Sequence, residues 1–83
     1  MTIERQALGW PLRAELTSLD NGITVLLTSG CRTHICCVTA AEPGGLLRTM
    51  DFPEHREKAV AEEWAETLAK QSGRRVCVVC GIH

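Results

Sequence analysis

The sequence predicts an α+β domain in which a mostly antiparallel sheet carries one long helix, in the order ββββαβ. Two observations lead to this prediction. Short apolar runs separated by glycine and proline turns occupy the chain up to Asp51, which is typical of strands. Apolar residues then recur every four positions, which is typical of a helix, before a last apolar run follows Gly73. At 83 residues the chain is short, so we expect a single domain over residues 1–83.

The first pair of strands is predicted as a hairpin. Residues Leu12 to Ser18 alternate imperfectly between apolar and polar side chains, and Ile23 to Thr28 form the returning strand. Between them lies Asp20-Asn21-Gly22, a strong turn signal because Asn-Gly tolerates the positive φ angles of a tight turn. The segment Ile3 to Trp10 has no clear pattern, and a short helix there is one possibility.

Two further strands are predicted from Thr33 to Ala41 and from Leu46 to Asp51, with Pro43-Gly44-Gly45 turning the chain between them. In the first of these, apolar or small side chains occupy both faces. Ile35, Cys37 and Thr39 alternate with His34, Cys36, Val38 and Ala40.

The helix is predicted between Pro53 and Gly73. Its start is marked by Asp51, a candidate cap, and by a proline that a first turn tolerates. Its end is marked by Gly73. One apolar stripe runs along it, and the charged residues are expected to face water. The stripe consists of Val60, Trp64 and Leu68 with Ala61 and Ala65. The charged residues are Glu62, Glu63, Glu66 and Lys70.

The last strand, Arg75 to Ile82, is apolar throughout, so we expect it to be central and covered on both faces. One helix covers only part of one face of such a sheet. The sequence therefore predicts self-association through the sheet or an edge strand as a homodimer, with a hetero-complex as the alternative.

Composition excludes several classes of protein. A formal net charge of -1 argues against a nucleic-acid binder. The segment Met1-Thr-Ile-Glu-Arg-Gln does not resemble a signal peptide, and no apolar run approaches the ~18 residues of a spanning helix. We therefore expect a cytoplasmic protein.

The five cysteines are expected to be thiols that serve mainly as small buried hydrophobes. Cys77 and Cys80 have C-x-x-C spacing, but Val78-Val79 between them is strand sequence, so the two should point to opposite faces. The same holds for neighbouring Cys36 and Cys37. A disulfide or zinc site between Cys77 and Cys80 is not expected, and Cys31, in a predicted loop, should be the most exposed thiol.

The chain contains three histidines, His34, His55 and His83, and each stands where a predicted element meets a loop. Imidazole binds metals and moves protons near neutral pH, and such positions leave room for a ligand. If the third strand and the last strand are antiparallel neighbours, His34 and His83 meet at one sheet edge, and the helix must start at that same edge with His55. The sequence thus predicts one site, with Arg32 nearby. Alternatively, each histidine is an ordinary surface residue.

Three local motifs extend this prediction: Arg32-Thr33-His34-Ile35, Pro53-Glu54-His55-Arg56-Glu57 and Gly81-Ile82-His83. Their order and spacing resemble those of the LpdD-like prenylated-flavin chaperone family, the small D subunit of gallate-type hydroxyarylic acid decarboxylases. The resemblance covers roughly Asn21 to His83. The chain departs from the family pattern by stopping at His83 and by a shorter segment from Glu42 to Phe52.

The resemblance implies a fold similar to proteasome-assembly-chaperone-like domains, usually dimeric. It also implies a protein without catalysis of its own that carries prenylated FMN to, or matures it for, the large decarboxylase subunit. Under this reading the cofactor-binding residues are Arg32, His34, His55, Arg56 and His83, and the phosphate would lie at the helix start, where free N–H groups bind anions.

Two competing functions remain open at this stage. His34, His55 and His83 could form a three-nitrogen site for zinc or another divalent metal, either alone or bridging to the ligand's phosphate. A small enzyme using histidine as acid or base ranks lower, because the sequence shows no Ser-His-Asp or Cys-His order.

Overall fold

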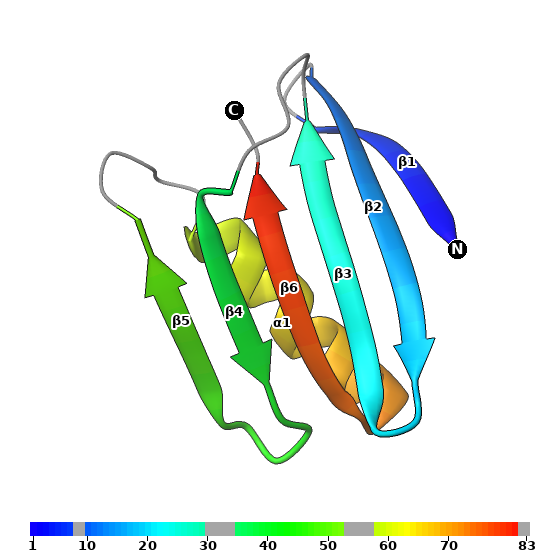
Figure 1. Ribbon diagram of the computed structural model, residues 1–83, viewed down its shortest axis with the longest axis vertical. Helices are drawn as coiled ribbons and strands as arrows, with labels where there is room; N and C mark the ends of the chain where they lie inside the picture. Colours follow the sequence, from blue (N-terminus) through cyan, green and yellow to red (C-terminus); the bar gives the residue numbers. More distant parts are fainter. Residues whose placement is uncertain (8–9, 30–34, 53–57, 82–83) are drawn as a thin grey trace.

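The computed structural model describes residues 1–7, 10–29, 35–52 and 58–81. They form one six-stranded sheet in the order β1-β2-β3-β6-β4-β5, with a helix on one side of it (Figure 1). The α+β class and the single helix are confirmed. The elements are β1 (Thr2–Ala7), β2 (Trp10–Leu19), β3 (Gly22–Ser29), β4 (Cys37–Ala41), β5 (Leu47–Asp51), α1 (Lys58–Ser72) and β6 (Arg75–Gly81).

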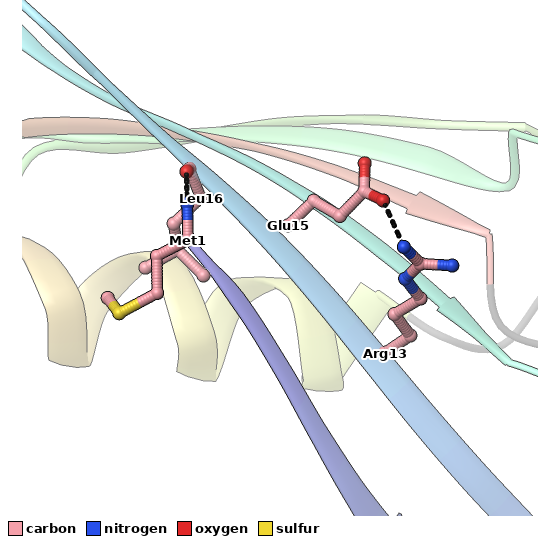
Figure 2. Close-up of polar contacts among 4 residues, drawn as sticks. All are labelled: Met1, Arg13, Glu15 and Leu16. Atoms are coloured by element: carbon pink, nitrogen blue, oxygen red, sulfur yellow. Dashed lines mark hydrogen bonds and ion pairs between the residues drawn. The ribbon is translucent and has the colours of Figure 1, made fainter.

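Strand β1 was not predicted from the sequence. It pairs antiparallel with β2, from Thr2 opposite Glu15 to Ala7 opposite Trp10, so the possible helix over residues 3–10 is wrong for its described part. The pairing extends to the N-terminus, where the ammonium group of Met1 donates to the carbonyl of Leu16 at 2.9 Å and the Leu16 amide donates to the Met1 carbonyl at 2.7 Å (Figure 2). Residues 2–7 form a strand because they pair with the backbone groups along the edge of β2, and not because their own side chains alternate between apolar and polar.

The predicted hairpin of β2 and β3 is confirmed, with Leu19 opposite Gly22 and Asp20-Asn21 forming the turn. Gly22 does not have a positive φ and is needed instead for a close approach. A Cβ atom at this position would lie 2.6 Å from the carbonyl oxygen of Arg75, because β6 passes close beside it. Because glycine has no Cβ atom, it lets the backbones of β3 and β6 approach each other closely where their pairing begins.

Strand β6 is central, as predicted. It runs parallel to β3, with Val25 opposite Val78, and antiparallel to β4, with Thr39 opposite Val78. The helix ends as predicted at Gly73, whose φ of 67° is left-handed and whose amide donates to the carbonyl of Ala69 at 2.9 Å. This cap turns the chain directly into β6.

The core lies between α1 and the sheet face toward it. Its helix side is an alanine stripe, Ala61, Ala65 and Ala69, which is completely buried. Ala61 and Ala65 belong to the predicted stripe, whereas its larger members Val60, Trp64 and Leu68 are only half-buried and pack beside the alanines. Small side chains let the helix backbone approach the sheet closely, chiefly over β4 and β6. The sheet contributes Leu12, Ala14, Val25, Leu27, Cys37, Ala41, Val76, Val78 and Cys80 to the same cluster.

The opposite, outer face of the sheet is not covered by α1, which lies behind the sheet in Figure 1. Within the described residues of one chain, β6 is covered on the helix face only, since Cys77 and Val79 are half-buried. That a partner covers its other face stays a prediction. A row of apolar residues crosses this face in register. It consists of Leu26, Val79, Val38 and Met50, and Leu26 and Met50 are 42% and 64% exposed. We call these four residues the outer row.

On β2, the residue next to the outer row is Glu15, which stands opposite Leu26 and forms an ion pair with Arg13 at 2.8 Å (Figure 2).

Cys77 lies on the outer face of the sheet and Cys80 on the helix face, as the strand prediction required. Cys77 has a free thiol, so no disulfide joins the two. Cys31 lies outside the described residues. No helix in the described part of the chain is long and apolar enough to cross a membrane.

Candidate functional site

One end of the sheet gathers the ends of four strands and the start of the helix. Strands β3, β5 and β6 end there at Ser29, Asp51 and Gly81, β4 begins there at Cys37, and α1 begins there at Lys58 (Figure 1). We call this end the Cys36 edge.

Backbone hydrogen bonds hold the Cys36 edge together beyond the last regular strand pairs. The Phe52 amide donates to the Cys36 carbonyl at 3.1 Å, and the Cys36 amide donates to the Cys80 carbonyl at 2.7 Å. Cys36 is completely buried. These bonds fix the chain segments next to β5, β4 and β6 relative to one another, which gives a rigid base for whatever follows them.

All five residues predicted for the site, Arg32, His34, His55, Arg56 and His83, lie outside the described residues. Their described neighbours do lie together. Ser29 and Ile35 precede and follow the first pair, Phe52 and Lys58 flank the second, and Gly81 precedes the last. The premise of the prediction is confirmed, because Cys37 stands opposite Cys80 in antiparallel strands and the helix starts at the same edge. Whether the imidazoles meet stays a prediction.

Two apolar side chains at the Cys36 edge are open to solvent. Ile35 is 57% exposed and Phe52, the single phenylalanine of the chain, is 40% exposed. Both directly adjoin the hydrogen-bonded residue Cys36, Ile35 in sequence and Phe52 through its amide. Exposed apolar groups beside a polar site suit a ligand with a flat ring or a partner surface. The sequence did not indicate either residue for this role. The signal that could have found Phe52 is its place as an aromatic residue immediately before Pro53.

The described first turn of α1 contains Lys58 and no acidic residue. Lys58 is exposed. A helix N-terminus carries partial positive charge, and Lys58 adds to it, whereas the exposed carboxylate of Asp51 at the end of β5 opposes it.

A metal site is not visible in the part of the chain that the structure describes: residues 1–7, 10–29, 35–52 and 58–81 contain no group of three or more histidine, cysteine, aspartate or glutamate side chains able to hold an ion. The three-histidine hypothesis concerns residues outside these ranges.

A chain of side-chain hydrogen bonds joins two strands to the helix. Thr39 on β4 is completely buried, and its hydroxyl oxygen lies 3.0 Å from that of Thr49 on β5. Thr49 Oγ1 donates to Glu62 Oε2 at 2.6 Å. Glu62 was expected to face water and is instead half-buried. The helical period alone could not show this contact, because its partner lies on β5.

The fold and the Cys36 edge define a small one-helix α+β protein whose elements converge where a ligand is expected. The comparison with known families makes this specific. The chain matches the model of the prenylated flavin chaperone LpdD-like domain over residues 6–83, and it therefore belongs to that family. The match extends the resemblance seen in the motifs to β2 and the last two residues of β1. No curated protein matches the chain.

Proposed function

We propose that this protein binds prenylated FMN and delivers it to, or matures it for, an aromatic acid decarboxylase in the cytoplasm, without catalysis of its own. The observation that carries the proposal is the family membership over residues 6–83. The gathering of strand ends and helix start at the Cys36 edge supports it.

The proposed ligand contacts are Arg32, His34, His55, Arg56 and His83. The described residues nearest to them in sequence support their grouping, because Cys36 is joined by backbone hydrogen bonds to both Phe52 and Cys80. The two arginines would hold the phosphate as fork-shaped donors.

The described residues fit such a ligand at both of its ends. Lys58 and the positive end of α1 suit the phosphate, and the exposed Ile35 and Phe52 suit the apolar ring. A divalent metal bridging the histidines and the phosphate is a variant of the same proposal, and metal analysis distinguishes it.

We further propose that the protein is a homodimer that pairs through its outer face. The outer row is apolar and lies in register across four strands, with Ala40 and Cys77 beside it. An apolar sheet face open to water is costly for a monomer. The large decarboxylase subunit is the alternative occupant.

The test is to co-express the protein with a flavin prenyltransferase and to record the visible absorbance of the purified protein. We expect a flavin band in stoichiometric amount, and mass spectrometry should identify prenylated FMN. A colourless protein that also fails to bind the added cofactor would overturn the proposal. Stoichiometric metal without flavin would instead favour the metal-binding function.

A further inference from the structure

The hydrogen-bond chain from Thr39 through Thr49 to Glu62 joins three elements in a defined direction. A hydroxyl has one proton, and Thr49 uses its proton toward Glu62. Thr39 must therefore donate to Thr49 across the 3.0 Å contact. The 2.6 Å separation between Thr49 Oγ1 and Glu62 Oε2 is typical of a hydroxyl that donates to a carboxylate, a strong kind of hydrogen bond.

The rest of the contact between α1 and the sheet is of a different kind. The alanine stripe packs on apolar side chains such as Val78 and Cys80. Apolar contact is non-directional, and methyl groups form a smooth ridge, so this packing fixes the depth of the helix better than its position along its axis. A directional bond between Thr49 and Glu62 supplies the missing constraint.

The position of this bond matters. Glu62 lies one turn from the first described residue of α1, and Thr49 lies two residues before the end of β5. The bond therefore fixes the helix near its N-terminal end, the end that belongs to the Cys36 edge. A small axial or rotational shift of α1 would move Lys58 relative to Phe52 and change the distance that the connecting residues must span.

We propose that Thr39, Thr49 and Glu62 are positioning residues that hold the N-terminal end of α1 against β4 and β5, and so set the geometry with which the Cys36 edge binds its flavin. The ligand part of this inference rests on the proposed function. The mechanical part, that the bond holds one end of the helix, does not.

The experiment compares variants that break the bond with variants that keep it. Thr49→Val and Glu62→Ala remove the donor and the acceptor, whereas Thr49→Ser and Glu62→Gln retain a donor and an acceptor. Glu66→Gln is the matched control, since Glu66 lies one turn further on and pairs within the helix with Lys70 at 3.7 Å. Two quantities are measured: the dissociation constant for prenylated FMN, and amide hydrogen exchange along α1.

We expect Thr49→Val and Glu62→Ala to weaken flavin binding about tenfold, the effect of one charge-assisted hydrogen bond. Exchange should accelerate in the first hydrogen-bonded turn of α1, at the amides of Glu62 to Ala65, more than near Ser72. Thr49→Ser and Glu66→Gln should remain within about twofold of the parent in affinity, whereas Glu62→Gln, which keeps the acceptor but loses the charge, should lie between the parent and Glu62→Ala.

Unchanged affinity in the bond-breaking variants, or exchange that accelerates uniformly along α1, would overturn the proposal and leave the contact a general stabilising one. If Thr49→Val does not fold, Glu62→Ala against Glu62→Gln decides the same question. If the parent protein binds no flavin, the proposed function fails, and the exchange pattern alone decides whether the bond holds this end of the helix.

Discussion

The guanidinium group of Arg74 donates a hydrogen bond from Nη1 to the hydroxyl oxygen of Ser18 at 2.8 Å. Its Nη2 also donates to the carbonyl of Leu19. The two bonds attach the residue just before β6 to the last residues of β2, next to the hairpin turn and across the intervening strand β3, at the sheet end opposite the Cys36 edge.

Arg74→Ala should lower the free energy of unfolding by about 1 kcal/mol, because solvent competes for a partly exposed group. For a domain of this size this corresponds to roughly 4–8 °C in melting temperature. Arg13→Ala is the control, since its ion pair with Glu15 is exposed and should be worth no more than about 0.5 kcal/mol. Equal shifts in thermal unfolding for the two variants would contradict this expectation.

Gly22→Ala should destabilise the protein by about 1–3 kcal/mol, because the new Cβ atom would lie 2.6 Å from the Arg75 carbonyl oxygen and force β3 and β6 apart. Gly44→Ala is a suitable comparison, since no atom lies within 4 Å of a Cβ built there. Urea denaturation measures both. A Gly22→Ala variant as stable as Gly44→Ala would show that the two strands separate at little cost.

Charge on the outer row should dissociate the proposed dimer. Leu26→Glu and Met50→Glu place carboxylates on a face that would be buried in the dimer, where an unpaired charge is costly. Light scattering across micromolar concentrations should show monomers, and circular dichroism should show an intact fold because both positions are exposed in one chain. Leu46→Glu, in the β4–β5 turn and 56% exposed, should remain dimeric. A parent protein that is strictly monomeric over this range would rule out the dimer.

The two cysteines of the C-x-x-C pair should respond differently to serine substitution. Cys80→Ser places a hydroxyl in a completely buried site and should cost about 1–3 kcal/mol, whereas Cys77→Ser on the half-buried outer face should cost less. The double variant should be less stable but should bind flavin about as tightly as the parent. Loss of a stoichiometric metal in the double variant would show instead that the pair is a metal site.

Replacement of the histidines tests the proposed ligand contacts. His34→Ala or His55→Ala should weaken binding of flavin, or of a metal that holds it, by about tenfold or more, the effect of one lost ligand or charge-assisted contact. Melting temperature should change little. Arg74→Ala serves here as a second control, because it destabilises the opposite end of the sheet and should leave the dissociation constant unchanged. Parent-like binding by both histidine variants would make these histidines ordinary surface residues.

Local signals explain which elements the sequence could predict. Asn21-Gly22 marks the hairpin, Gly73 ends the helix, and the apolar run after it identifies β6 as central; all three depend on nearby residues. Strand β1 could not be predicted in this way, because Thr2–Ala7 has little apolar alternation and becomes a strand only by pairing with β2.

The arrangement of strand ends on which the candidate site depends was predictable for a topological reason. Antiparallel neighbours bring the start of one strand beside the end of the other, and this arrangement is found at Cys37 and Cys80. The bond from Thr49 to Glu62 was not predictable, since a helical period shows which side of a helix is apolar but not which polar group meets it. The sequence did indicate two apolar sheet faces and a single helix, which can cover only one of them, as the structure shows.

The central position of β6 also has a consequence for the order of folding. The β1-β2-β3 group and the β4-β5 pair share no strand pairing in the described sheet; β6 joins them, and it is the last strand in chain order. The two parts can form from contacts between sequence neighbours, but the sheet closes only when β6 enters between them. Until then the inner edges of β3 and β4 offer unpaired backbone groups, so a folding chain is most vulnerable to aggregation while β6 is still unpaired.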